Sequence, residues 1–213
     1  SNKEARFCVS KIKMFYRKND ENIILGELPE KRIFSKLKHS DASKQFKMLA
    51  QGCSIPAPGT FFRKSIFEQY GYFDTKFRTF EDWHQWLKFL LHGERLFLLD
   101  DFTVFFRRHA NSISTSSLYS KNKDFYLDNL NVYKEYIFPN LDKLSLIEAF
   151  SVLTRSKRYN KLLNEGISKK NYNLARLYRL IDPLWWVDIP HWIIRNLKHI
   201  KMEKEIFGKG ASK

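Results

Sequence analysis

The stretch that decides the fold runs from Gly71 to His109 and reads GYFDTKFRTFEDWHQWLKFLLHGERLFLLDDFTVFFRRH. From residue 83 the apolar residues recur at 83, 86, 87, 90 and 91, the spacing of a helix with one buried face. This pattern predicts a helix that begins near residue 80 and ends at Gly93, since glycine tolerates the left-handed conformation of a helix end. Residues 95–99 and 102–106 are typical of strands, with Asp100 and Asp101 expected in a turn between them.

Two carboxylates, Glu81 and Asp82, lie in the first turn of this predicted helix. The helix dipole stabilises negative charge there, and a helix end often faces a cleft or solvent, so Asp82 is a candidate base. A structural alternative stays open. Thr79 and Asp82 fit the capping-box pattern, in which Asp82 accepts the backbone N–H of the N-cap residue. Spacing alone favours the capping role, because caps are commoner than catalytic bases.

Upstream of Gly71 the patterns alternate between strands and helices. We expect strands at 5–16, 22–25 and 60–63, with a turn at 17–22. Between 29 and 49 the pattern predicts two short helices or a helical loop, and a further helix over 65–70 begins at a capping box and ends at Gly71. Strands mixed with helices in this way predict an α/β fold.

The order of these motifs resembles the second half of the catalytic domain of family-2 glycosyltransferases, which have the GT-A fold. The resemblance rests on PAPGTFFRK at 56–64, GYFD at 71–74, EDW at 81–83, Gly93, and FFRRH at 105–109 followed by serines, and it covers residues 5–116. It implies a truncated GT-A mixed sheet with helices over residues 1–118. Residues 119–213 would be a mostly helical, basic extension.

The resemblance also implies roles for particular residues. Asp82 matches the catalytic base of an inverting transfer, which takes the proton from an acceptor hydroxyl, and Glu81 is its acidic neighbour. Arg63, Trp83 and Arg107 fall at substrate-binding positions. His109 matches a position that reaches the diphosphate or its metal, with an exposed histidine at a strand end as the alternative.

The chain departs from the family in one respect: it contains no Asp-x-Asp metal motif. We therefore expect it to begin after the donor site, with residues 1–2 as the remnant of a tag. A full-length enzyme of this kind would use Mg²⁺ or Mn²⁺, a nucleotide-sugar donor and a glycan or lipid-linked acceptor, as in cell-surface polysaccharide synthesis. The fragment alone is expected to hold no metal and to be inactive.

The last quarter of the chain is strongly basic. From Arg155 onward it holds fourteen Lys or Arg against five Asp or Glu, a net charge of +9. Helical spacing recurs at 127–137, 144–153, 159–163 and 171–181. Residues 184–207 then combine tryptophans with basic residues, which suits the surface of an anionic membrane. The alternative is that these aromatic residues pack onto the domain or onto a second copy, forming a homo-oligomer.

Composition excludes several classes of protein. The chain has 213 residues, 43% of them hydrophobic, and a net charge of +15, so it is too apolar for a disordered protein. Cys8 and Cys53 fit neither a disulfide framework nor a zinc site, which favours a cytoplasmic setting. No apolar run is long enough to span a membrane, so any contact with its inner face would be peripheral.

The basic charge leaves a second function open, that of a non-catalytic adaptor for membranes or nucleic acids. No nucleic-acid-binding module is recognisable in the sequence, so a nucleic-acid partner is not expected.

Overall fold

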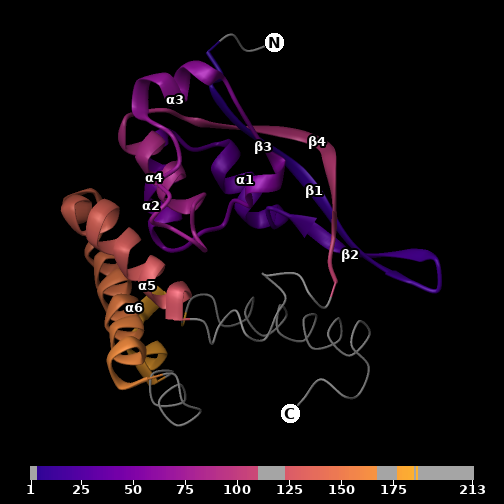
Figure 1. Cartoon of the computed structure of the whole chain (residues 1–213). Helices are drawn as coiled ribbons and strands as arrows, with labels where there is room; N and C mark the ends of the chain where they lie inside the picture. Colours follow the sequence, from indigo (N-terminus) through magenta and orange to yellow (C-terminus); the bar gives the residue numbers. More distant parts are fainter. Residues whose placement is uncertain (1–3, 110–122, 167–176, 185, 187–213) are drawn as a thin grey trace.

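The computed structural model describes residues 4–109, 123–166, 177–184 and 186, and within them the fold is α/β, as predicted (Figure 1). Four strands form one mixed sheet, and six α-helices accompany it within the described residues. The predicted α/β class is thereby confirmed. Figure 1 shows the sheet and helices α1–α4 on one side and helices α5 and α6 side by side on the flank away from the β1–β2 hairpin.

Strand β1 (Phe7–Lys18) is the centre of the sheet. It forms an antiparallel hairpin with β2 (Glu21–Leu28), which confirms the predicted strand, turn and strand. The turn is tighter than expected, because only Asn19 and Asp20 link the strands, with φ of 48° and 65°. Positive φ at both central residues is the geometry of a type I′ hairpin turn, and Asn and Asp adopt it more readily than most residues.

Strands β2 and β3 (Thr60–Phe62) both pair with one edge of β1, and the longer strand β4 (Leu96–Arg107) pairs with the opposite edge. Strand β3 pairs antiparallel with the start of β1, and β2 pairs with its end. Strand β4 runs parallel to β1. The two strands predicted at 95–99 and 102–106 are therefore one.

The expected turn at Asp100 and Asp101 is wrong, because these residues bulge out of a continuous strand. Ser10 pairs with Leu99 and Lys11 pairs with Phe102, which leaves the two aspartates without partners on β1. The Asp100 carboxylate forms ion pairs with Lys11 and with Lys38, the latter at 2.7 Å. These pairs hold the pKa of Asp100 at about 2, well below its usual value. A bulge stabilised by two lysines thus replaces the turn.

Helices α1–α4 each contribute side chains to the buried cluster that contains Phe7 and Val9 at the start of β1. Their bounds are Lys31–Lys38 for α1, Ala42–Ala50 for α2, Lys64–Tyr70 for α3 and Trp83–Leu91 for α4. The two short helices expected between 29 and 49 are present, and so is the helix that ends at Gly71. Gly71 and Gly93 both have positive φ, 83° and 84°, so each ends its helix as the sequence predicts. Helix α4 begins three residues later than expected.

The described part of the chain from residue 123 onward is mostly helical, as predicted. Helix α5 (Lys123–Val132) continues through a π-helical segment, Tyr133–Ile137, and a 3-10 helix, Phe138–Lys143, toward α6 (Leu146–Glu165). The segments expected at 144–153 and 159–163 belong to this single helix. Of the helix expected at 171–181, the described part, Leu177–Ile181, is a short 3-10 helix.

One hydrophobic cluster joins the sheet and the later helices. Side chains of Val132, Tyr133, Ile137 and Val152 belong to the same buried cluster as those of β1 and α4. The rings of Trp83 and Tyr133 meet edge to face with their centroids 5.8 Å apart. The helical region therefore completes the core around α4. The predicted boundary at 118/119 lies outside the described residues.

Candidate active site

The beginning of α4 leaves part of the Asp82 side chain exposed, whereas the residues that follow it, Trp83 to Leu87, are buried. Asp82 stands at the N-cap position with helical dihedral angles, φ −84° and ψ −45°, and its side chain makes no capping hydrogen bond. The capping-box alternative is wrong, because the backbone N–H of Thr79 donates to Oδ2 of Asp128 at 2.7 Å instead. The Asp82 carboxylate therefore has no capping role.

Asp128 of α5 makes the connection that the capping box would have made. It is 2% exposed, and its Oδ2 accepts hydrogen bonds from the backbone N–H groups of Arg78 and Thr79 and from the Thr79 hydroxyl, at 2.7–2.8 Å. Three donors satisfy a carboxylate that would otherwise be costly to bury. Sequence reasoning missed this residue because its partners lie about fifty positions away, although an acidic residue within an apolar helical pattern was a signal.

Trp83 and Trp86, which follow Asp82 in α4, anchor the helix in the core. Trp83 is 1% exposed, and its indole N–H donates to the carbonyl oxygen of Leu49 at 2.8 Å. The indole of Trp86 donates in the same way to Ile55 at 3.1 Å. The structure thus places Trp83, expected at a substrate-binding position, in the buried core, where it fixes the position of Asp82.

The environment of Asp82 makes its carboxylate an unusually strong base for an aspartate. Partial burial, followed by the negative charge of the exposed Glu81, raises the pKa of Asp82 to about 6, although the Trp83 backbone N–H and the Cys53 thiol act in the opposite direction. A carboxylate with such a pKa is mostly ionised at neutral pH, yet it accepts a proton more readily than an ordinary aspartate.

Cys53 is the second residue at this site that sequence reasoning missed. Its sulfur lies 3.7 Å from Oδ1 of Asp82 and 3.6 Å from the carbonyl oxygen of Ile55, so its single proton has two acceptors. Desolvation of the sulfur and the nearby charge of Asp82 raise the pKa of the thiol well above its usual value, although the residue as a whole is exposed. Cys53 is therefore a thiol, and a hydrogen-bond donor, when Asp82 is ionised.

The Gly71–Asp74 turn is held against α4 by His84. Nε2 of His84 accepts the backbone N–H of Asp74 at 3.2 Å, and its Nδ1 lies 3.2 Å from the carbonyl oxygen of Phe80. Nδ1 must then carry the ring proton, so the imidazole is neutral. Burial lowers the pKa of His84, and its ring stacks on Phe77. The motif of the turn and the motif of the helix thus form one local unit.

The remaining predicted residues lie apart from one another. Arg63 follows β3, and its Nε donates to the carbonyl oxygen of Ala5 at 2.9 Å. Arg107 is exposed and lies opposite Phe15 in the strand register, near the end of β1 that is farther from Arg63. The exposed His109 follows two residues later. Nine residues of β1 separate these two places, about 30 Å at 3.3 Å per residue. One compact site therefore cannot hold both Arg63 and His109.

Within the described ranges there is no group of three or more His, Cys, Asp and Glu side chains that could hold a metal ion. Asp100 is paired with two lysines, and Asp82 contacts a thiol, so neither lies in a set of convergent ligands. The divalent metal that the resemblance implies for a full-length enzyme stays a prediction.

The region expected to contact a membrane lies almost entirely outside the described residues. Of residues 184–207 only Leu184, whose backbone N–H donates to Asp182, and Trp186 are described. Trp186 is exposed, and its indole N–H donates to the carbonyl oxygen of Leu180 at 2.8 Å. In the described part of the chain, no helix has the length and apolar character needed to cross a bilayer.

Comparison of the chain with family models, curated proteins and solved structures found no match.

Proposed function

We propose that this chain is the acceptor-side half of an inverting glycosyltransferase of the GT-A type, with Asp82 as the general base. The observation that carries the proposal is the state of Asp82: it lies at a helix start on a buried tryptophan anchor, has no capping role, and has a pKa of about 6. Its place within the motif order described above supports the same role.

In the proposed reaction the Asp82 carboxylate takes the proton from an acceptor hydroxyl as its oxygen attacks the anomeric carbon. The bond between the acceptor oxygen and that carbon forms while the bond from the carbon to the diphosphate breaks, and the nucleoside diphosphate leaves. Glu81 keeps the pKa of Asp82 high, and Cys53 offers a donor to its Oδ1. The proton then passes from Asp82 to water.

The direct test is Asp82→Asn in a longer form of the protein that includes the donor-binding half. We expect transfer to fall by about 10²–10⁴-fold, the usual contribution of a general base, with the fold unchanged by circular dichroism. Asp142→Asn, an exposed carboxylate at the end of the turn before α6, is the matched control and should keep full activity. Near-normal turnover of Asp82→Asn would remove this residue from the base role.

Donor binding by the chain itself gives a second test of the same proposal. Because the described residues hold no cluster of metal ligands, we expect calorimetry to find weak uridine-diphosphate affinity with or without Mn²⁺. Tight, metal-dependent binding would mean that the chain carries a donor site of its own, and the proposed division into halves would then be wrong.

The second candidate function is a non-catalytic basic adaptor at a membrane. The observation that favours it is the group of exposed apolar residues on α6, with Leu146 91% exposed.

A further inference from the structure

Helix α6 buries Val152, but most of its other large apolar residues near its beginning are exposed. Hydroxyl residues are buried, namely Ser151, Thr154 and Ser156. The apolar residues Leu146, Ile147, Phe150 and Leu153 are exposed, and Leu146 is 91% exposed. A helix that only completed a core would carry the opposite pattern. Exposed apolar residues grouped in this way indicate a surface that meets an apolar partner.

Three of these residues share one face of the helix. Leu146, Phe150 and Leu153 are spaced i, i+4 and i+7, so they project in nearly the same direction, and Ile147 adjoins them. We call these four residues the α6 apolar face. The buried side of the helix is fixed independently, since Ser151 donates to Asp182 at 2.6 Å and Arg155 pairs with it at 2.9 Å. The apolar face is therefore not required for packing within the described fold.

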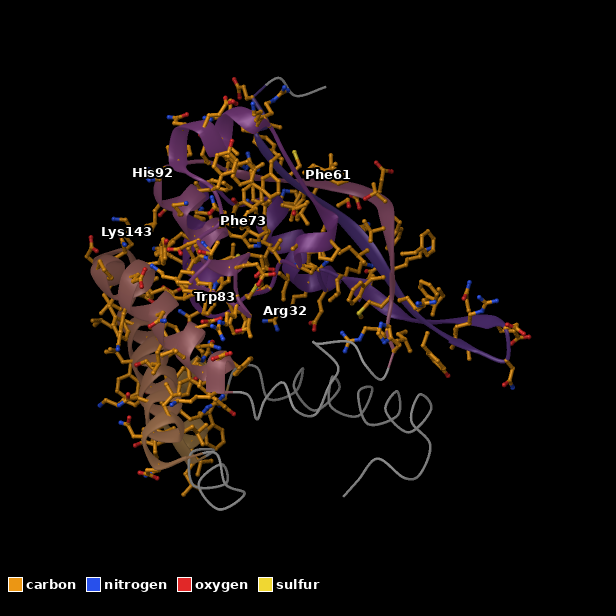
Figure 2. All side chains as sticks on the ribbon, viewed as in Figure 1. Arg32, Phe61, Phe73, Trp83, His92 and Lys143 are labelled. Carbon is orange, nitrogen blue, oxygen red and sulfur yellow. The ribbon has the colours of Figure 1, made fainter. Side chains whose placement is uncertain are left out.

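Basic side chains flank this face. Lys143 and Lys157 are exposed just before and just after it, together with Asp142. Glu148 is engaged by the Ser145 backbone N–H and hydroxyl, both at 2.8 Å, in the helix cap. Figure 2 shows Lys143 on the outer flank of the molecule, beside α6 and away from the sheet.

We propose that the α6 apolar face is a docking surface for an anionic lipid bilayer, with Lys143 and Lys157 at the level of the headgroups. The choice between a bilayer and a second copy rests on charge. A chain with a net charge of +15 is attracted to an anionic surface and repelled by its own copy. Apolar residues flanked by lysines on a surface helix match the interfacial region of such a membrane. This inference does not depend on the proposed enzymatic function.

The test is sedimentation of the full chain with vesicles of phosphatidylcholine containing about 30% phosphatidylglycerol, against vesicles of phosphatidylcholine alone. We expect binding to the anionic vesicles that weakens as salt rises, and little binding to the neutral ones. Leu146→Ser with Phe150→Ser should weaken binding about tenfold or more, because two large apolar groups no longer enter the interface.

The matched control is Ile24→Ser with Phe105→Ser, two residues of similar exposure on the sheet, which should bind like the wild type. Circular dichroism melting checks the fold of both double variants, and Leu146→Ser alone, at the most exposed position, serves if the double variant unfolds. The proposal is overturned if the wild type does not bind, if it binds both vesicles equally, or if the α6 variant binds normally. It is also overturned if analytical ultracentrifugation finds a dimer that the α6 variant abolishes.

Discussion

Helices α4 and α6 carry their apolar residues in opposite senses. In α4 the apolar face points inward, and Trp83, Trp86, Leu87, Phe89 and Leu90 are all buried. In the first half of α6, Leu146, Ile147 and Phe150 point outward, while Ser151 and Thr154 face the core together with Val152. Both helices show apolar residues at helical spacing in the sequence. Such spacing therefore identifies a face of a helix, and the surrounding structure decides whether that face is buried.

The largest expected difference between the two helices is in the effect of truncating an apolar side chain. Trp86→Ala should lower the free energy of unfolding by about 3–5 kcal/mol, because it leaves a cavity among Phe7, Phe62 and Phe73. Leu146→Ala in α6 should change it by less than about 0.5 kcal/mol. Urea denaturation of both variants measures the difference. A loss in Leu146→Ala close to that in Trp86→Ala would show that the α6 apolar face is buried in the folded chain.

The two helices also begin in different ways. Ser145 and Glu148 cap α6 locally, whereas the chain entering α4 is held by Asp128 from a distant helix. Asp128→Ala should cost about 2–3 kcal/mol of stability, because three buried donors lose their acceptor. Ser145→Ala should cost about 1 kcal/mol, the usual effect of losing a cap. Thermal melting compares the two, and equal losses would contradict the structural role given to Asp128.

Whether a contact is local or joins distant residues decides whether it could be predicted from the sequence. The hairpin, the first three helices and both glycine helix ends follow from local patterns, and they are present. The bulge at Asp100 could not be predicted, because Lys11 and Lys38 that hold it come from other elements. The same applies to the site. The sequence indicated the position of Asp82, but its contacts with Cys53 and its release from capping by Asp128 depend on distant residues.

Removing the charge of the carboxylate at the start of each helix, Asp82 in α4 and Glu148 in α6, should change the stability of the fold in opposite directions. The folded-state pKa of Asp82 is about 6, raised from 3.8, so its ionisation destabilises the fold above pH 6 and this penalty fades as pH falls toward 3.8. Asp82→Asn should therefore gain about 1–2 kcal/mol at pH 7, allowing for partial exposure, and about nothing at pH 4. Glu148→Gln should instead lose about 0.5–1 kcal/mol at pH 7, because it weakens the cap of α6.

Urea titrations at pH 4 and pH 7 test this pair of variants. A more stable but inactive Asp82→Asn would indicate a charge kept for function at the expense of stability. If Asp82→Asn instead lost stability at pH 7, the carboxylate would be a structural acceptor and the base role would be untenable.

The smallest expected effect concerns Cys53, whose proton lies between Asp82 and the Ile55 carbonyl oxygen. If the thiol donates to Asp82, it favours the ionised carboxylate, so Cys53→Ala should raise the pKa of Asp82 further. Cys53→Ser should lower it, because a hydroxyl is a stronger donor than a thiol. Carbon-13 NMR titration of the Asp82 carboxyl measures both shifts, with Cys8→Ala on β1 as the control that leaves it unchanged. No shift in Cys53→Ala would mean that the proton goes to Ile55 instead, and that burial and Glu81 alone set the basicity of Asp82.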